Sequence, residues 1–397
     1  MESCDVLIIG GGPAGSSCAW KLAGSGLDVL VMDKKGFPRD KPCAGWITPA
    51  LVDELHLDLD DYRCGPSPLP LPPTSGGGVG VRGRVLEPIT TFAVSLMGGP
   101  EVEATYDRPI SYGIRRCEFD HYLLLRSKAR LRLGEAVKSL ERGGDKWIVN
   151  GTIEARVLVG AGGHFCPVAR LLGPRAEKGV AVIAAQEIEV ELTADQLRGC
   201  RARPGVPYLA FCPDLKGYGW YFRKGNFLNV GLGREDDRQL SDHVAAYFEA
   251  LKQQGKIPRD LSAPFKGHAY LLYPTSARPL VGEGVLLAGD AAGMAYSPSG
   301  EGIRPAVETG LLAAEVIASA AGDYRRERLE PYRARVAARF GRRPAPSLTR
   351  MMPDGLKRAL ARRLMRWRWF ARRVVVDSWF LRSHEPALRL NGQPARA

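Results

Sequence analysis

Cys43 is the residue of this 397-residue chain whose setting first suggests chemistry. It lies in the stretch KPCAGWITP, residues 41–49, as a candidate metal ligand, disulfide partner, nucleophile or part of the wall of another site. The eight cysteines are dispersed without a CxxC pair, and the six histidines show no metal-ligand spacing. We therefore expect reduced thiols and no metal site. An apolar setting raises the pKa of a free thiol, so proton donation suits Cys43 better than nucleophilic attack; the alternative is a small buried hydrophobic residue.

A glycine-rich turn before Cys43 has the spacing of a dinucleotide-binding site. DVLIIG, residues 5–10, predicts a buried parallel strand, and a helix-like stretch follows the GxGxxG motif at residues 10–15. The glycines of such a motif allow a tight turn, close approach of the backbone to a pyrophosphate, and close packing of helix on strand. A second strand, residues 27–33, ends at a carboxylate that can accept a hydrogen bond from a ribose hydroxyl. The candidate binding residues here are Gly10, Gly12, Pro13, Ala14, Gly15, Asp33 and Lys34.

A second strand–loop–helix stretch lies at residues 284–320. Its strand ends at a Gly-Asp pair, a loop of Gly, Ser and Pro follows, and a long helix begins near residue 302. A carboxylate at the strand end can hold a polyol hydroxyl, and the positive end of the helix dipole favours a negatively charged group in front of it. The alternative is an ordinary strand–loop–helix unit with a capping aspartate. The candidate binding residues are Gly289, Asp290, Gly300, Gly302 and Ile303.

Together these segments resemble the flavoprotein monooxygenase-like superfamily, whose chains open with GxGxxG and carry a late Gly-Asp motif. The resemblance covers roughly the first 320 residues and implies bound FAD, with Arg116 of the segment IRRCEFDHYLL, residues 114–124, lying over it. Where this family usually has GADG followed by an arginine, the chain has Gly162 in place of the aspartate, and Arg170 matches the arginine. In the hydroxylase branch that aspartate helps to organise the pyridine nucleotide, so its absence puts direct reduction by NAD(P)H in doubt.

Two further stretches resemble the geranylgeranyl reductase family within this superfamily. PCAG at residues 42–45 is similar to its PCGG motif, and YGWYFRK at residues 218–224 is similar to its YxWxFPK motif. The chain departs from these motifs at Ala44, at Trp46 and at Arg223. The resemblance implies that Cys43, Ala44 and Gly45 lie beside the isoalloxazine ring. There Cys43 has a steric role, or it supplies or relays a proton to the reduced substrate.

The strand YGWYF alternates aromatic side chains between its two faces. Tyr218, Trp220 and Phe222 share one face, which can form the wall of an apolar slot. The alternative is ordinary packing of a sheet against helices. We take Cys43 and Trp220 as candidate catalytic residues; the candidate substrate contacts are Trp46, Tyr218, Trp220 and Phe222. The bulk of Trp46 suggests a smaller or differently shaped substrate than a long prenyl chain.

We expect an α/β fold with a Rossmann-like FAD-binding domain interleaved with a β-rich (α+β) substrate domain. The FAD-binding domain is expected at residues 1–65, 110–175 and 275–324, and the substrate domain at residues 66–109 and 176–274. A basic, helical C-terminal region, residues 325–397, follows. The stretch GPSPLPLPPTSGGG, residues 65–78, predicts a crossover loop, and residues 241–255 predict a helix on the substrate-domain sheet.

The net charge of +13 is concentrated in this C-terminal region. Residues 325–397 hold 20 basic and 5 acidic side chains, whereas residues 1–324 hold 36 and 38. Residues 355–382 predict an amphipathic helix with an arginine-rich polar face, which is typical of a helix lying on anionic lipid. The alternatives are docking on the protein body and nucleic-acid binding, but we expect no nucleic-acid partner because no DNA-binding motif is present. The apolar stripe comprises Leu356, Leu360, Leu364, Trp367, Ala371 and Val374.

The sequence thus predicts an FAD-dependent oxidoreductase that reduces carbon–carbon double bonds of an isoprenoid or related apolar molecule. The electron donor would be NAD(P)H or a ferredoxin, so a donor protein is a possible partner. The first alternative is a flavin hydroxylase of an aromatic or polyketide compound, and the second is a catalytically idle flavoprotein that binds lipid. We find no signal peptide and no membrane-spanning run, and expect a cytoplasmic protein, peripheral on the inner face of the membrane if the tail binds lipid.

Overall fold

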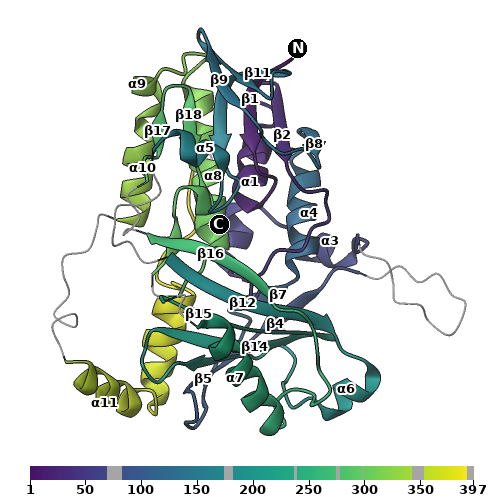
Figure 1. The fold of residues 1–397 in the computed structure, drawn as a ribbon, viewed down its shortest axis with the longest axis vertical. Coiled ribbons are helices and arrows are strands. Elements are labelled where there is room, and N and C mark those ends of the chain that lie inside the picture. Colours follow the sequence, from purple (N-terminus) through teal and green to yellow (C-terminus); the bar gives the residue numbers. More distant parts are fainter. Residues whose placement is uncertain are drawn as a thin grey trace, which may run out of the picture.

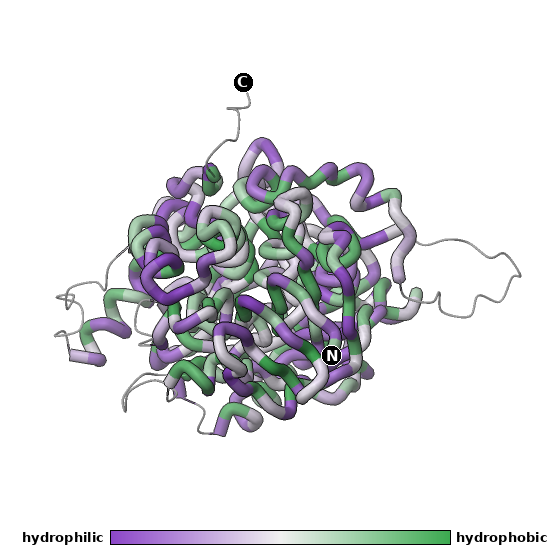
Figure 2. Tube along the Cα trace, turned by 90° about the horizontal axis from the view of Figure 1, so that it is seen from above, coloured by the Kyte–Doolittle hydropathy of each residue, from purple (hydrophilic) through white to green (hydrophobic). Residues whose placement is uncertain are grey.

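The computed structural model of the chain describes residues 1–68, 83–173, 182–236, 239–273, 278–297, 299–341 and 353–390. Two large sheets lie one beyond the other along the long axis of the molecule (Figure 1). Apolar stretches of the chain run through the interior (Figure 2). Most of the Pro/Gly-rich stretch expected as a crossover loop, residues 69–78 of 65–78, lies outside the described residues.

The first sheet has the parallel core expected of a Rossmann-like unit. Its strand order is β17-β18-β11-β1-β2-β8, with β1 parallel to both β11 and β2, and β9 and β10 extend it as a hairpin beside β11. Parallel strands of this kind are covered on both faces, which explains the continuous apolar run in β1. The strands are β1 (Glu2–Ile9), β2 (Val29–Asp33), β8 (Arg130–Leu133), β9 (Leu140–Gly143), β10 (Lys146–Val149), β11 (Ile153–Gly160), β17 (Val281–Gly282) and β18 (Val285–Leu287).

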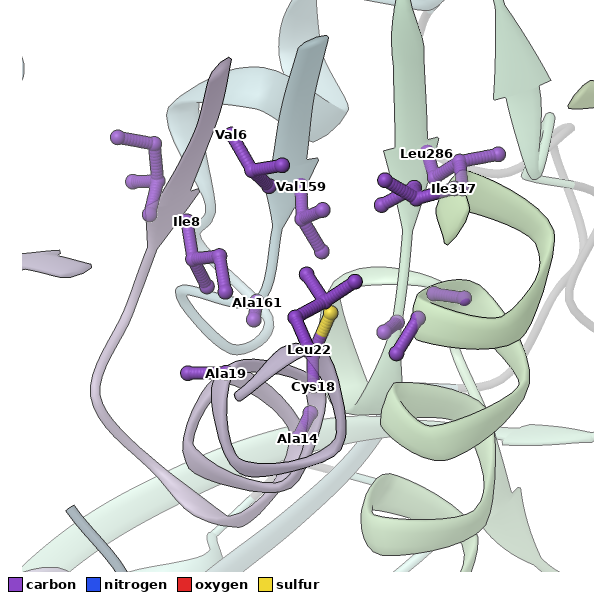
Figure 3. Close-up of a cluster of buried hydrophobic side chains, with 14 of the residues drawn as sticks. Val6, Ile8, Ala14, Cys18, Ala19, Leu22, Val159, Ala161, Leu286 and Ile317 are labelled. Carbon is purple, nitrogen blue, oxygen red and sulfur yellow. The ribbon is translucent and has the colours of Figure 1, made fainter. Parts of the chain in front are cut away.

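Two helices from opposite ends of the chain pack side by side against this sheet. They are α1 (Pro13–Leu22) and α8 (Ile303–Ser319), and Figure 3 shows Ala14, Cys18 and Leu22 of α1 in the core that they share. The two backbones approach closely because residue 310 is glycine: a Cβ there would lie 2.2 Å from the carbonyl oxygen of Ala14. The other helices of this half are α4 (Arg116–Arg126), α5 (Pro167–Leu171), α9 (Arg326–Leu329) and α10 (Pro331–Phe340).

The second sheet is mostly antiparallel and has the strand order β19-β16-β12-β15-β14-β13-β5-β6. One face of it is covered by α7 (Leu240–Gln253), as the sequence predicts for residues 241–255, and α6 (Ala194–Gly199) lies nearby (Figure 1). The strands are β5 (Thr91–Leu96), β6 (Val102–Thr105), β12 (Val182–Glu191), β13 (Pro207–Phe211), β14 (Gly217–Lys224), β15 (Phe227–Arg234), β16 (Lys266–Tyr273) and β19 (Ala295–Tyr296).

A small third sheet carries the segment that follows Cys43. It consists of β3 (Trp46–Ile47), β7 (Ser111–Ile114) and β4 (Leu86–Ile89). The short helices α2 (Pro49–Glu54) and α3 (Leu59–Cys64) come directly after β3. Because β4 leads almost at once into β5, the small sheet ties the Cys43 segment to the large antiparallel sheet.

The basic tail does not form the single helix expected at residues 355–382. It forms α11 (Asp354–Leu364), a turn, and then a separate π-helix, Phe370–Phe380. The π-helix packs through Ala371, Val375, Val376 and Phe380 against the apolar face of β5 and its neighbours, whereas α11 has no buried residue. The expected apolar stripe is therefore broken, because its second half turns onto the sheet. No helix among the described residues is long and apolar enough to cross a membrane.

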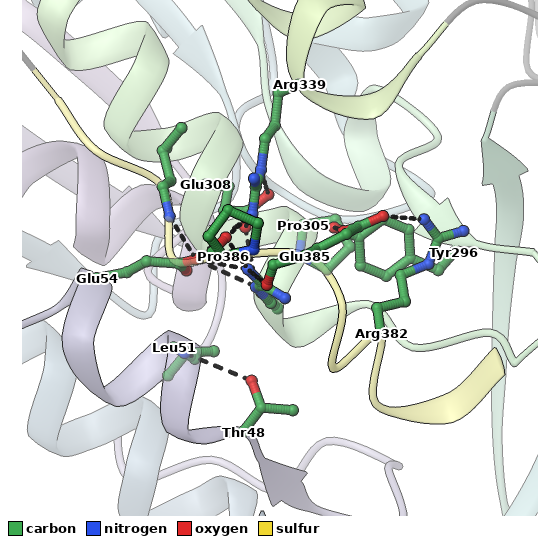
Figure 4. Close-up of polar contacts among 12 residues, drawn as sticks. Thr48, Leu51, Glu54, Tyr296, Pro305, Glu308, Arg339, Arg382, Glu385 and Pro386 are labelled. Atoms are coloured by element: carbon green, nitrogen blue, oxygen red, sulfur yellow. Dashed lines mark hydrogen bonds and ion pairs between the residues drawn. The ribbon is translucent and has the colours of Figure 1, made fainter. Parts of the chain in front are cut away.

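The last described residues are held against α8 by a buried polar network (Figure 4). Arg304 of α8 donates to Glu54 Oε1 at 3.1 Å and to the carbonyl oxygen of Pro386 at 2.8 Å. Arg339 donates to Glu308 Oε1 at 2.6 Å and to the same Pro386 carbonyl at 2.8 Å. Burial and the neighbouring Glu308 carboxylate raise the pKa of Glu54. This network fixes the end of the tail beside α2, α8 and α10.

We expect Gly310→Ala to destabilise the chain by about 1–3 kcal/mol, because the added methyl group would force α1 and α8 apart. The measurement is the free energy of unfolding from urea denaturation. Ser319→Ala, at an exposed position of the same helix, is the matched control and should change the free energy by less than about 0.5 kcal/mol. Equal stability of the two variants would contradict the close packing of α1 and α8.

Candidate active site

Most of the candidate residues line a single cavity of about 660 Å³. Its walls come from the turn between β1 and α1, the segment after β2, the loop before α8, and strands β12, β14 and β16 of the large antiparallel sheet. Of the predicted site residues, Gly15, Gly289 and Phe222 are the ones that do not line it. Those that line it are Gly10, Gly12, Pro13, Ala14, Asp33, Lys34, Cys43, Ala44, Gly45, Trp46, Arg116, Gly162, Tyr218, Trp220, Asp290, Gly300, Gly302 and Ile303.

One end of the cavity is formed by the N-terminus of α1. The N-cap residue is Gly12, which has no side chain to cap the helix, so the first N–H groups of α1 remain directed at the cavity. Gly10 has a φ of +117°, and a Cβ there would lie 2.4 Å from the carbonyl oxygen of Ala161. Asp33 accepts a hydrogen bond from the N–H of Gly11 at 2.8 Å, which fixes its carboxylate at the cavity wall. This end can therefore bind a pyrophosphate and a ribose.

Gly15 and Gly289 act behind the cavity wall and make close packing possible. A Cβ on Gly15 would lie 1.9 Å from the carbonyl oxygen of Gly10. Gly289 has a φ of +61°, and its Cα faces Ala14 and Ala306, where α1 and α8 meet. They position the residues that line the cavity and do not line it themselves.

The N-terminus of α8 opens into the same cavity through Gly302 and Ile303. The Asp290 carboxylate is paired with Lys41 Nζ at 3.1 Å and with His268 Nε2 at 3.3 Å. Lys41 and His268 hold the pKa of Asp290 well below its usual range, although burial opposes them. A negatively charged group placed here would meet a helix dipole and a lysine.

Cys43 and Arg116 are neighbours on the cavity wall. Arg116 binds Asp120 through two hydrogen bonds of 2.8 Å, and Arg39 also contacts Asp120, at 3.3 Å. Burial raises the pKa of the Cys43 thiol, and the Arg116 guanidinium opposes this shift only in part. The Cys43 side chain is therefore a neutral thiol at neutral pH, able to hold a proton at the cavity wall.

Two residues that the sequence analysis missed connect Cys43 to Trp220. The carboxylate of Glu187, on β12, accepts the N–H of Cys43 at 2.6 Å. Asn229, on β15, donates to Glu187 Oε2 at 3.3 Å and to the carbonyl oxygen of Cys43 at 3.2 Å, and it accepts the Trp220 indole N–H at 2.6 Å. No local motif marks Glu187 or Asn229. Asn229 is a polar side chain within the largely apolar strand β15, whereas Glu187 is one of three glutamates of β12 and has no such signal.

Lys224 anchors the segment that follows Cys43. It is fully buried, and its Nζ donates to the carbonyl oxygens of Ala44 at 3.0 Å and Ile114 at 2.9 Å. It also pairs with the Glu189 carboxylate. Gly45 has a φ of +74°, and a Cβ there would lie 2.4 Å from Ile114 O and 2.8 Å from Lys224 Nζ. The lysine of the YGWYFRK motif thus holds the Cys43 segment against β7 and β14.

The aromatic wall of the cavity consists of Trp46, Tyr218 and Trp220. The Tyr218 hydroxyl donates to the carbonyl oxygen of Ser299, which joins β14 to the loop before α8. Phe222, expected as a substrate contact, lies behind this wall: its ring fills the space over Gly113 and packs against Trp46, with ring centroids 6.4 Å apart. Tyr218, Trp220 and Phe222 alternate along β14 as expected, but Trp46 lies between the Phe222 ring and the cavity.

Gly162 and Arg170 both line the cavity near the α1 end, together with His164 and Phe165, which the sequence analysis did not identify. A Cβ on Gly162 would lie 3.3 Å from Cys166 Sγ, so the turn here is compact.

The residues present fit FAD. A helix N-terminus without a capping side chain, a glycine turn and the Asp33 carboxylate would hold its adenosine diphosphate half. Gly300, Gly302 and the aromatic wall would hold its isoalloxazine ring beside Cys43.

Three comparisons identify similar proteins. Residues 5–63 match the model of the FAD-dependent oxidoreductase family. The chain is 32% identical over 354 residues to the menaquinone reductase of Mycobacterium tuberculosis, covering 80% of this chain and 77% of that protein. It is 30% identical to the geranylgeranyl diphosphate reductase of Rhodobacter capsulatus, covering 78% and 74%. A geranylgeranyl bacteriochlorophyll reductase-like protein of Thermoplasma acidophilum has the same fold, with a TM-score of 0.70 at 19% identity, covering 92% of this chain and 88% of that one.

We expect Lys224→Met to destabilise the chain by about 3–5 kcal/mol, because it removes the buried ammonium from the Ala44 and Ile114 carbonyls and leaves the partly buried Glu189 carboxylate with Arg115 as its cation. The measurement is urea denaturation of the single variant and of Lys224→Met/Glu189→Gln. The double variant should be the more stable of the two, because it removes both charges of the pair. A double variant that is less stable than the single one would show that Lys224 does not act through Glu189.

Proposed function

The chain belongs to the geranylgeranyl reductase family of FAD-dependent oxidoreductases, and we propose that it reduces carbon–carbon double bonds of an isoprenoid chain or a related apolar molecule. The observation that carries this proposal is the continuity of one cavity, from the dinucleotide-binding turn at Gly10–Gly12 to the aromatic wall of Trp46, Tyr218 and Trp220. The relatives are named for menaquinone and geranylgeranyl diphosphate, two molecules that carry isoprenoid chains. An apolar slot selects such chains by shape and buried area.

FAD, when bound and reduced, supplies the hydride for this chemistry. The protein residues have two tasks. Trp220 and Tyr218 hold the double bond in place and exclude water. The Trp220 ring can position the substrate because its own indole N–H is fixed by Asn229. An unactivated alkene is a poor hydride acceptor, so a proton must be delivered to its second carbon, and the neutral Cys43 thiol lies at the wall to deliver it.

Trp46 sets the length of the slot in this proposal. It is buried and packs against Phe92, Phe222 and Phe380, with ring centroids 5.8–6.4 Å apart. Because Phe380 belongs to the C-terminal π-helix, the tail supports the ring from behind. We therefore infer that Trp46 excludes long, straight prenyl chains and favours a shorter or bent substrate.

We expect anaerobic, dithionite-reduced holoenzyme to be reoxidised by geranylgeranyl diphosphate and to saturate a double bond in the isoprenoid chain of menaquinone. For menaquinone the readout is the saturated chain, identified by mass spectrometry, because the quinone ring also accepts electrons from the flavin. Trp46→Gly should speed reduction of geranylgeranyl diphosphate, while Leu125→Gly, which changes an exposed side chain of α4 outside the cavity, serves as control. Flavin that stays reduced with both probes, but forms a hydroperoxide intermediate in air, would contradict the proposal and favour a hydroxylase. Dependence of reduction on NADPH or on reduced ferredoxin would identify the electron donor.

We also propose that α11 rests on the surface of an anionic lipid bilayer, where an isoprenoid substrate would dissolve. Leu356, Leu360, Trp367 and Trp369 are 44–66% exposed, an unusual concentration of exposed apolar side chains within 14 residues. Leu356 and Leu360 are one helical turn apart and so share a face. The cations of this segment are Lys357, Arg358, Arg362, Arg363, Arg366 and Arg368, against the single acidic residue Asp354. Apolar and cationic side chains together complement acyl chains and anionic headgroups.

We expect the holoenzyme to bind vesicles containing phosphatidylglycerol but not vesicles of phosphatidylcholine alone, as measured by co-sedimentation. Arg362→Gln/Arg363→Gln should weaken binding roughly tenfold or more, since each cation near the surface contributes about 1 kcal/mol. The matched control, Arg326→Gln/Arg328→Gln, removes the same charge from exposed positions of α9 and should bind like wild type. Equal loss in both variants would contradict a specific role for α11.

A further inference from the structure

Glu187 is a carboxyl group that the proposed mechanism leaves unused, although it lines the cavity beside Cys43. It is 5% exposed and sits in the middle of β12. Its Oε1 accepts the N–H of Cys43 at 2.6 Å, so the carboxyl group lies against the backbone of the residue that carries the thiol. Asn229 orients the other oxygen, Oε2, at 3.3 Å.

The sheet around Glu187 is built to hold this arrangement. Gly231 of β15 is paired opposite Glu187, and a Cβ there would lie 2.7 Å from Glu187 Cβ and 2.3 Å from Trp220 Cζ2. The glycine thus leaves the space in which the carboxyl group and the indole ring approach each other. Trp220 is in turn fixed by the same Asn229 that orients Glu187.

We propose that Glu187 is the proton relay of this site, recharging the Cys43 thiol when that thiol has given its proton to the reduced carbon. This inference rests on the proposed reduction of a double bond. The hydride brings both electrons to one carbon, and the thiol proton goes to the other carbon. The carboxyl proton then moves to the thiolate sulfur, and the carboxylate takes a proton from solvent once the product has left. Glu187 does not touch the double bond in this sequence, so it acts through Cys43.

The charges that face Glu187 support its holding a proton at neutral pH. Burial, reinforced by the charge of Glu189, raises the pKa of Glu187 to about 8, against the opposing N–H of Cys43, the charge of Lys224 and the amide of Asn229. On the adjacent strand β16, Lys266 is paired with Asp40, and His268 with Asp290. Because the folded-state pKa is raised, the acid form predominates below pH 8, and above it the protonated fraction falls about tenfold per pH unit.

The test separates a relay from a purely structural role, because glutamine keeps the acceptor oxygen for the Cys43 N–H but carries no proton. Wild-type single-turnover reoxidation with geranylgeranyl diphosphate, which has no quinone ring to accept electrons in place of the double bond, should be flat up to about pH 8 and then fall. Glu187→Gln should slow it by roughly 10²–10⁴-fold and remove the inflection, and Glu187→Asp should be slower than wild type but keep an inflection. Glu191→Gln, a carboxyl removed from the end of the same strand, is the control. A Gln variant with the wild-type rate and pH profile would overturn the relay.

A second readout does not depend on turnover. The infrared spectrum of the oxidised wild-type holoenzyme minus that of Glu187→Gln should show a protonated carboxyl band at pH 7 that is lost on raising the pH through about 8. Burial also raises the pKa of Glu301 and of Glu54, and their bands cancel in this difference. If no probe is reduced but this band is present, the proposed function fails while the proton store at Glu187 stands. If wild type turns over but the band is missing, the relay is wrong and the reductase stands.

Discussion

The close contact between α1 and α8 is the constraint on which the site depends. Gly310 lets the backbone of α8 approach the first turn of α1 at Ala14, and any larger residue would separate the two helices. The contact brings the N-termini of both helices to one cavity, although about 290 residues separate them in the chain. Two positive helix ends then face the same cavity, which a single glycine motif could not provide.

A second constraint is that the large antiparallel sheet holds the Cys43 segment through buried polar side chains. Lys224, Glu187 and Asn229 all bind main-chain atoms of residues 43–44. Buried charged and polar groups contribute little net stability, because desolvation offsets their attraction. What they provide is geometry: the Cys43 segment is held between the cofactor-binding turn and the aromatic strand, where a flexible loop would leave the thiol poorly placed.

The C-terminal region packs against the outer side of the aromatic wall and against α8. Its π-helix supports Trp46 from behind through Phe380, and its last described residues are bound to α8 through Arg304 and Arg339. Among the described residues of the C-terminal region, α11 and the turn that follows it have exposed leucine, tryptophan and arginine side chains. The same region therefore supports the aromatic wall of the cavity and carries the proposed lipid contact. In our proposal this would couple the position of the enzyme on a bilayer to the place where an apolar substrate is bound.

The sequence by itself determined the features that depend on local spacing. The glycine turn and its flanking strands, the late Gly-Asp loop, the alternation of Tyr218 and Trp220, and the basic tail all follow from short-range periodicity and composition. Only the tertiary structure decided which strands meet: Glu187 lies 144 residues from Cys43, and Lys224 lies 180 residues from Ala44. It also placed Phe222 behind Trp46 and broke the tail helix in two. Such contacts depend on strand register and long-range packing, which no local pattern specifies.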